Sequence, residues 1–414
     1  MGGNATGIIK RTGETTRAQK VEFAKVSRSE FIKKTIELLT KLNELYFKKY
    51  KEKIWDDESI LRDGTAFNGS TSFIMNTSIP DDEILKFKGS AGDIDVTVPD
   101  NCRENLWKLL DSLEDKTVIP GVKYKGCCQP SYSPGLQQFN SVFEVKFKAG
   151  TVYTQIDFEL MPFVNNKPNE WTKFSHSSSL QDYERGVKGG VFHKLLIRSI
   201  VGAASIRNDV VIATSSSTPE NIKISNSKKY INPRFTAFSV TKGIRNVFKP
   251  MLDKDGNIVK YNGKEVYQEI PTKDSTFVDQ IDGIFKITFH QYKATKEDLR
   301  LFNSFVGVID LMKKYFDKKT IKLSHDRFIN ILWGDEGGRA QELENGNPEL
   351  DFNLKNAAYQ YFIKELGLKD ESGKYVDKYY KEYGQRRARL FGVSESRVSR
   401  DGHVTFAEFL GLQR

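Results

Sequence analysis

The sequence predicts an α/β protein of the α+β type, in which a mixed sheet with helices precedes a mainly helical C-terminal domain. Segments with alternating apolar residues concentrate between residues 60 and 165, for example "GDIDVTVP" and "FNSVFEVKFKAGTVYTQIDFELMPF". Segments with helical spacing dominate from about residue 275 onward. The 414 residues are 38% hydrophobic and 29% charged, which is typical of a folded chain with two or three domains.

The chain begins with a polar and basic segment, and residues 1–26 are predicted to be a flexible basic arm. Ser27 and Glu30 then form a capping-box pattern ahead of one long amphipathic helix, "SEFIKKTIELLTKLNELYFKKYKEK". The remaining boundaries are placed where the dominant periodicity changes. They give a sheet domain with this helix over residues 27–165, a mixed α/β region over 166–274 and a helical domain over 275–414.

Within the sheet domain, "GTAFNGS" predicts a short strand that ends in a turn at Gly69 and Ser70, before a helix that begins in "TSFIMN". The segment "GDIDVTVP" predicts a strand that ends at Pro99, and "NCRENLWKLLDSLED" predicts a helix. Two alternating arms around Ala149 and Gly150 predict a hairpin. Farther along, "DYERGVKGGVFHKLLIRSIVGAA" predicts one helix despite its adjacent glycines.

The charge balance favours a polyanionic partner. The formal net charge is +10, and clustered Lys and Arg bind phosphate backbones by releasing counterions. The alternative is a lysine-rich surface without such a partner. The three cysteines fit neither a disulfide framework nor a zinc spacing. No apolar run resembles a signal peptide or a membrane span, so we expect a cytoplasmic protein without a membrane partner.

Two acids one residue apart stand inside the strand "GDIDVTVP". Strand side chains alternate, so Asp93 and Asp95 share one face while Ile94 and Val96 point into the core. Acids in a strand cost β-propensity, and two on one face repel each other. Such an arrangement becomes favourable when the carboxylates share divalent cations, because Mg²⁺ prefers hard oxygen ligands. The alternative is a pair of solvated acids on an edge strand.

The second arm of the hairpin places Asp157 and Glu159 on one face. If the two strands are neighbours, one of these acids lies beside Asp93 and Asp95. A strand rises about 3.3 Å per residue, so Asp157 and Glu159 start roughly 6 to 7 Å apart and only one is level with the pair. Asp157 is the expected third ligand because it lies in the middle of the strand, whereas Glu159 is nearer its end.

These elements resemble the polymerase-β-type nucleotidyltransferase superfamily. The Gly-Ser turn matches Gly69 and Ser70, the acid-apolar-acid strand matches Asp93 and Asp95, and the third acid on a later strand matches Asp157. The resemblance covers about residues 60 to 165. The gap between Ser70 and Asp93 is longer than the family usually shows, so an insertion around residues 76–88 is expected. The chain is also similar to uncharacterised nucleotidyltransferase-like proteins of bacteriophages, which would place it in the host cytoplasm.

The resemblance implies a palm-like fold and transfer of a nucleoside monophosphate from an NTP, such as ATP, to an acceptor hydroxyl, with release of pyrophosphate. Asp93, Asp95 and Asp157 would hold two Mg²⁺ or Mn²⁺ ions, and Asp157 would assist deprotonation of the acceptor. The basic charge makes an RNA 3′ end the leading acceptor, with tRNA among the candidates. The alternatives are a nucleotidyltransferase that modifies a protein or small molecule, and a non-catalytic nucleic-acid-binding protein of the same fold.

Further cations are expected to contact the substrates. Lys188 and Lys194 are predicted to approach the nucleotide, and so are Gly69 and Ser70 of the turn. The alternative for both lysines is that they lie on a solvated basic helix face. His176 is expected to be a cap or surface residue rather than a base. A basic cluster near the C-terminus either binds nucleic acid or is a solvated helix face. It contains Arg386, Arg387 and Arg389.

Overall fold

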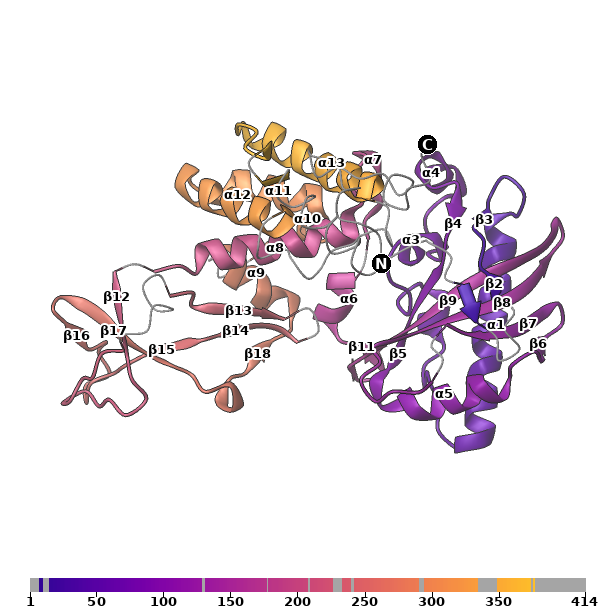
Figure 1. Ribbon diagram of the computed structural model, residues 1–414, viewed down its shortest axis with the longest axis horizontal. Helices are drawn as coiled ribbons and strands as arrows, with labels where there is room; N and C mark the ends of the chain where they lie inside the picture. Colours follow the sequence, from indigo (N-terminus) through magenta and orange to yellow (C-terminus); the bar gives the residue numbers. More distant parts are fainter. Residues whose placement is uncertain are drawn as a thin grey trace, which may run out of the picture.

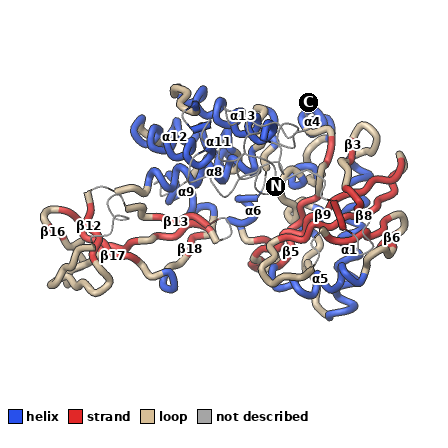
Figure 2. Tube along the Cα trace, viewed as in Figure 1, coloured by secondary structure: helices blue, strands red, loops and turns tan. Residues whose placement is uncertain are grey.

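The computed structural model describes ten stretches of the chain, and within them the protein is mixed α/β, as predicted. Figure 1 shows one sheet with its helices on the right, a group of helices in the upper middle and a second group of strands on the left. Figure 2 shows the same separation of strands and helices. The described residues are 7–9, 15–128, 131–176, 178–207, 209–225, 233–239, 242–289, 294–333, 348–373 and 375–376.

A five-stranded sheet forms the centre of the first unit, with the strand order β5-β9-β8-β7-β6. Its strands are β5 (Ile94–Pro99), β6 (Thr117–Ile119), β7 (Val122–Cys127), β8 (Gln138–Phe147) and β9 (Gly150–Met161). Strand β5 runs parallel to β9, and every other pair is antiparallel. The predicted hairpin is confirmed, because β8 and β9 meet at a turn where Gly150 has φ +138°.

Helices cover the core of this sheet. The long helix α1 (Arg28–Tyr50) begins at Ser27, whose hydroxyl accepts a hydrogen bond of 3.2 Å from the Glu30 backbone N–H, as predicted. Leu38, Leu39 and Leu42 of α1 are buried, so the apolar stripe of the helix faces the core. The other helices of this unit are α2 (Ser59–Arg62), α3 (Thr71–Ile74), α4 (Asp81–Phe87) and α5 (Arg103–Ser112).

The expected flexible arm needs a correction, because its C-terminal part is packed. Val21–Glu22 form β3, which pairs with β4 (Ser90–Ala91). Val21, Phe23 and Val26 are buried in the same core as α1. Burial of these three apolar side chains holds residues 21–26 on the first unit. Two short strands also pair upstream, β1 (Gly7–Ile9) and β2 (Thr15–Arg17).

The second unit is helical. Its helices are α6 (Glu170–His176), α7 (Leu180–Glu184), α8 (Gly189–Ala204), α9 (Ile281–Phe289), α10 (Lys296–Phe302), α11 (Phe305–Tyr315), α12 (Lys318–Trp333) and α13 (Pro348–Leu366). Helix α8 packs against α11 and α12 within one core. The helices expected in the middle region therefore belong with the C-terminal helices. The single helix expected over residues 182–204 is instead two helices, because the chain turns at Gly186, where φ is +72°.

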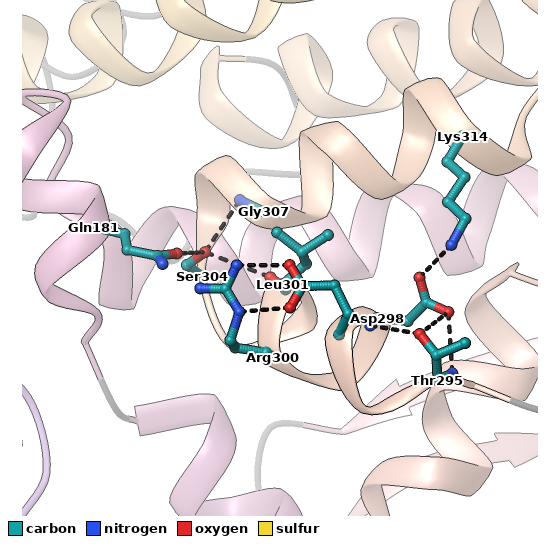
Figure 3. Close-up of polar contacts among 9 residues, drawn as sticks. Gln181, Thr295, Asp298, Arg300, Leu301, Ser304, Gly307 and Lys314 are labelled. Carbon is teal, nitrogen blue, oxygen red and sulfur yellow. Dashed lines mark hydrogen bonds and ion pairs between the residues drawn. The ribbon is translucent and has the colours of Figure 1, made fainter.

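Polar side chains fix α7, α10 and α11 relative to one another (Figure 3). Thr295 and Asp298 form a reciprocal capping box at the start of α10, and Asp298 also accepts a hydrogen bond of 2.7 Å from Lys314. Ser304 caps α11 by accepting from the Gly307 backbone N–H at 3.0 Å. These bonds satisfy the N–H groups that a helix N-terminus leaves unpaired, so both helices begin at defined residues.

The strands between α8 and α9 lie to the left of and below the helical unit (Figure 1). A four-stranded sheet contains β12 (Val210–Ala213), β15 (Phe248–Pro250), β16 (Lys260–Tyr261) and β17 (Lys264–Glu269). A three-stranded sheet contains β13 (Thr236–Ser239), β14 (Gly243–Asn246) and β18 (Phe277–Val278). Two residue pairs form the hairpin of β10 (Phe163–Val164) and β11 (Lys167–Pro168). Within the described part of the chain, none of the helices combines the length and apolar character needed to cross a membrane.

Candidate active site

Three aspartates meet where β5 and β9 lie side by side. The parallel register places Asp95 directly opposite Asp157, and Asp93 immediately precedes β5. One carboxylate oxygen from each of the three lies within 4.8 Å of the others. The side chains are 4%, 7% and 0% exposed for Asp93, Asp95 and Asp157. The structure therefore confirms that the three acids lie close together, and we call them the acid trio.

The alternating pattern of the two strands explains why the acids converge. Ile94 and Val96 on β5, and Ile156 and Phe158 on β9, are buried in the core of the first unit. Because side chains alternate, burying these four residues turns the acids of both strands to the opposite face. A shift of one residue in the register would expose the apolar set, so core packing fixes the positions of the carboxylates.

Neighbouring polar groups orient the trio. Asp157 accepts hydrogen bonds from the Asn140 amide at 2.8 Å and from the Gln155 amide at 2.9 Å and 3.1 Å. The Asp95 backbone N–H donates to the Thr71 hydroxyl at 3.2 Å, and this hydroxyl donates to the Asp93 carbonyl at 3.3 Å. Helix α3 is thereby tied to the start of β5.

Burial and mutual repulsion make Asp95 and Asp157 reluctant to ionise. Burial raises the pKa of Asp95 well above its usual range, and the charges of Asp93, Glu159 and Asp157 raise it further. Burial, followed by the charge of Asp93, raises the pKa of Asp157 to about 7, although the amides of Gln155 and Asn140 oppose this. A cluster of three carboxylates is stabilised by a hard dication, because the ion supplies the missing positive charge. The donor set therefore fits Mg²⁺ or Mn²⁺.

The turn at Gly69 and Ser70 lies against the acid trio. Phe67 bridges Val96 on the outer side of β5, and the chain then turns at Gly69, where φ is +53°. A Cβ atom on Gly69 would overlap Oδ2 of Asp95, so only glycine fits this approach. Ser70 lies close to the Tyr183 side chain, and α3 follows. The predicted turn and helix are present, whereas the predicted strand is reduced to an isolated bridge between Phe67 and Val96.

Replacing Gly69 with Ala is expected to destabilise the protein and to displace Asp95. The left-handed backbone costs a residue with a Cβ atom about 1 kcal/mol or more, and the overlap with the carboxylate adds to this. Gly256 is the matched control, because its φ is +83° and a Cβ atom there would meet nothing within 4 Å. Thermal unfolding of both variants checks the difference. A Gly69→Ala variant that loses no more stability than Gly256→Ala would contradict the close approach.

Glu159 lies two residues beyond Asp157 and pairs with Thr97 rather than with an acid. It accepts a hydrogen bond from the Asn68 amide. Its charge also raises the pKa of Lys173 and of Lys194, although burial lowers both, that of Lys173 to about 8. Glu159 is therefore surrounded by cations and lies outside the trio.

Two predicted residues, Lys194 and His176, lie on this Glu159 side. Lys194 is half-buried on α8, so the alternative of a solvated helix face does not describe it. His176 is the last residue of α6, and its Nδ1 is 2.8 Å from the Thr172 carbonyl. The expected role of His176 as a cap agrees with this contact, whereas the expected surface position is wrong, because the ring is half-buried.

A group of lysines lies at the other end of the trio. The predicted residue Lys188 precedes α8, and its charge acts on Lys88. Lys88 is half-buried, its ammonium lies 5.5 Å from the centroid of the Tyr183 ring, and the charges of Asp93 and Asp95 act on it. The charge of Lys20 also lowers the pKa of Lys88, after burial and the charge of Lys188. Lys20 lies near Lys88 because the next residue, Val21 of β3, pairs with Ala91 of β4. Neither Lys20 nor Lys88 belongs to a recognisable sequence motif, so neither was predicted as a site residue.

A second group with possible metal ligands contains His325, Asp326 and Glu371. Here the ammonium of Lys322 lies 2.8 Å from a carboxylate oxygen of both Asp326 and Glu371. The lysine already supplies the positive charge that a metal ion would bring, so the acid trio is the better metal site.

Arg386, Arg387 and Arg389 lie outside the described residues, so their predicted role with nucleic acid stays a prediction. Comparisons with protein-family models, with curated proteins and with solved structures find no match for this chain. Function is therefore inferred from the acid trio itself.

Proposed function

We propose that this protein is a metal-dependent nucleotidyltransferase that moves a nucleoside monophosphate from an NTP to the 3′ hydroxyl of an RNA. The acid trio carries the proposal, because three buried carboxylates from adjacent parallel strands converge within 4.8 Å. The lysines near Asp93 add a feature expected around a triphosphate, and the glycine turn fixes the position of Asp95. The resemblance to the polymerase-β-type superfamily rests on the same residues and supports a palm-like fold.

Asp93, Asp95 and Asp157 would hold the metal ions. When bound, these ions neutralise charge on the phosphates and lower the pKa of an attacking hydroxyl. Asp157 would assist removal of the acceptor proton, whose hydroxyl pKa the ions lower. The acceptor oxygen then bonds to the α-phosphorus, and the bond from that phosphorus to the bridging oxygen breaks. The electron pair leaves with the pyrophosphate, and Lys20, Lys88 and Lys188 would stabilise its charge.

The rival functions make different demands on the site. A protein that only binds phosphates would do better without three clustered acids, since these repel a phosphate backbone. A transferase that modifies a protein or a small molecule would keep the trio but would not need a net charge of +10. The charge therefore favours RNA among the acceptors.

Labelling tests the proposal directly. The protein is incubated with each α-labelled NTP, with Mg²⁺ or Mn²⁺, and separately with RNA, DNA and protein pools. We expect label in the RNA pool and dependence on the dication. Label found only in the protein pool would show that the acceptor is a protein rather than an RNA. Absence of label from every pool would contradict the proposal that the protein is a nucleotidyltransferase.

RNA binding is expected to weaken steeply as salt rises, because cations that bind phosphates release counterions. Reversing the charge of Arg386, Arg387 and Arg389 should make the log–log slope shallower by about one unit for each phosphate that is no longer neutralised, and should leave NTP affinity unchanged. Fluorescence anisotropy of labelled RNA over a salt series measures the slope. A flat salt response would favour a protein or small-molecule acceptor instead.

A further inference from the structure

A cleft of about 750 Å³ lies between the first unit and the helical unit. We call it the α6 cleft, because Lys173 and Phe174 of α6 line it together with Thr65, Ser178, Ser179 and Asn303. Its volume is within the range of pockets that bind small ligands, and its lining is predominantly apolar with a few convergent polar groups. None of these residues belongs to a sequence motif that predicted a role for it.

The α6 cleft adjoins the acid trio through two of its own residues. The Ser178 backbone N–H donates to the Gly69 carbonyl at 3.3 Å, and Gly69 lies directly against Asp95. Lys173 interacts electrostatically with Glu159 most strongly and with Asp95 as well. Lys173 of the cleft lining is therefore on the Glu159 side of the trio.

The cluster of Lys20, Lys88 and Lys188 lies at the opposite end. The strongest charge interaction of Lys88 is with Asp93, and its interaction with Asp95 is weaker. The charges of Lys88 and Lys173 thus both interact with the charge of Asp95. Lys88 does so from the Asp93 side, and Lys173 does so from the Glu159 side. In Figure 1 the β3–β4 pair and α4 lie above β5, whereas β11 lies beside β5 and α6 lies to its left.

In phosphoryl transfer the attacking oxygen and the leaving oxygen lie roughly in line on opposite sides of the phosphorus. A phosphorus held at the acid trio therefore has its leaving pyrophosphate toward one end and its acceptor toward the other. Building on the proposed function, we infer that the lysine cluster at Asp93 holds the leaving pyrophosphate and that the α6 cleft receives the 3′-terminal nucleoside of the RNA acceptor.

The lining of the α6 cleft suits a nucleoside that carries a phosphate. The side-chain amides of Asn165, Gln280 and Asn303 offer donors and acceptors to a base edge, and Phe174 provides an aromatic surface. Lys173, together with Lys167 at the rim, supplies positive charge for the phosphate that links the terminal nucleoside to the next one. This combination is what the end of a single-stranded RNA requires.

Crosslinking locates the 3′ end without any need for turnover. A short RNA with 4-thiouridine as its 3′-terminal nucleoside is irradiated with the full-length protein in the absence of metal, and the crosslinked peptide is identified by mass spectrometry. We expect the crosslink within residues 163–181 or 280–303. A crosslink confined to other residues, such as 83–92 beside Lys88, would overturn the assignment.

Substitutions in the α6 cleft and in the lysine cluster, each with a control variant, test the two assignments separately. Asn303 is exposed at the cleft, so Asn303→Trp is expected to reduce the crosslink about tenfold and to leave NTP affinity unchanged. Asn353→Trp, an exposed position on α13, is the control and should change neither. Lys88→Gln should weaken NTP affinity by about tenfold and leave the crosslink intact, with the exposed Lys319→Gln as its control.

The outcomes separate this inference from the proposed function. Loss of NTP affinity in Asn303→Trp would show that the cleft takes the donor nucleoside, and would overturn the inference. An unchanged crosslink in that variant would overturn it as well. If the unaltered protein transfers no nucleotide to the same RNA in the presence of Mg²⁺ or Mn²⁺, it is the proposed function with RNA as acceptor that fails.

Discussion

Replacing Asp93 or Asp95 with Asn is expected to abolish nucleotide transfer and to leave the metal-free protein as stable as the parent or more stable. Activity is lost because an amide is a poor ligand for a hard dication in place of a carboxylate. Stability is retained because burial and the neighbouring charges of Asp93, Glu159 and Asp157 disfavour the ionised form of Asp95. A neutral side chain of the same shape removes that repulsion.

The pH dependence of this gain follows from the direction of the pKa shifts. A raised pKa means that the folded chain binds the proton more tightly than the unfolded chain does. For Asp157, with a pKa of about 7, stability of the metal-free protein is lost as pH rises from about 4 to about 7, by up to about 4 kcal/mol. The shift of Asp95 has the same sign, so its replacement should raise Tm at pH 8 but not at pH 4.

Thermal unfolding at both pH values, with and without Mg²⁺, measures these effects. The unaltered protein should gain stability as the Mg²⁺ concentration rises above the Kd of the site, whereas Asp95→Asn should gain little. Asp82, an exposed acid on α4, provides the control, because Asp82→Asn should leave activity and Tm unchanged. Transfer that survives in both Asp93→Asn and Asp95→Asn would remove these acids from the site.

The Asp157→Ala variant is expected to bind Mg-NTP nearly as well as the parent and to transfer nothing detectable. Asp157 lies opposite Asp95 and is completely buried, so its removal leaves the trio with two ligands. The role expected of Asp157 is toward the acceptor hydroxyl, so the loss should fall on the transfer step rather than on NTP binding.

Glu159→Ala is the paired variant, because Glu159 shares the strand and the face of Asp157. It pairs with Thr97 and accepts from Asn68, so we expect it to keep most of the activity. NTP affinity and single-turnover transfer, measured for both variants, decide between the two acids. An inactive Glu159→Ala beside an active Asp157→Ala would show that the third ligand has been assigned two residues too early.

The acid trio could be predicted because its information is local. Alternation along each strand fixes the face of Asp93, Asp95 and Asp157, and the only assumption was that the two strands are neighbours. The parallel register then places Asp95 opposite Asp157. Glu159 lies opposite Thr97, so Asp157 rather than Glu159 is level with Asp95. The turn at Gly69 was predictable for the same reason, because the Gly-Ser pair is itself a local turn signal; the strand expected before it is only a bridge at Phe67.

The surroundings of the trio could not be predicted in this way. Lys20 comes near Lys88 because β3 pairs with β4, and β3 lies in a segment that composition alone described as a flexible arm. Lys194 lies near Glu159 rather than near Asp93 because α8 packs against α11 and α12, whose sequences are more than a hundred residues away. Such long-range packing leaves no periodic signal in the sequence.

The order of the strands has a consequence for the way this protein acquires its site during synthesis. Strand β5 lies at the edge of its sheet, and its partner β9 follows only after the whole β6–β7–β8 meander. Closing a loop of that length carries an entropy cost before any contact is gained, so this pairing belongs to the slower steps of folding. A nascent chain therefore lacks the trio until β9 has left the ribosome, and partly folded forms hold their acids apart.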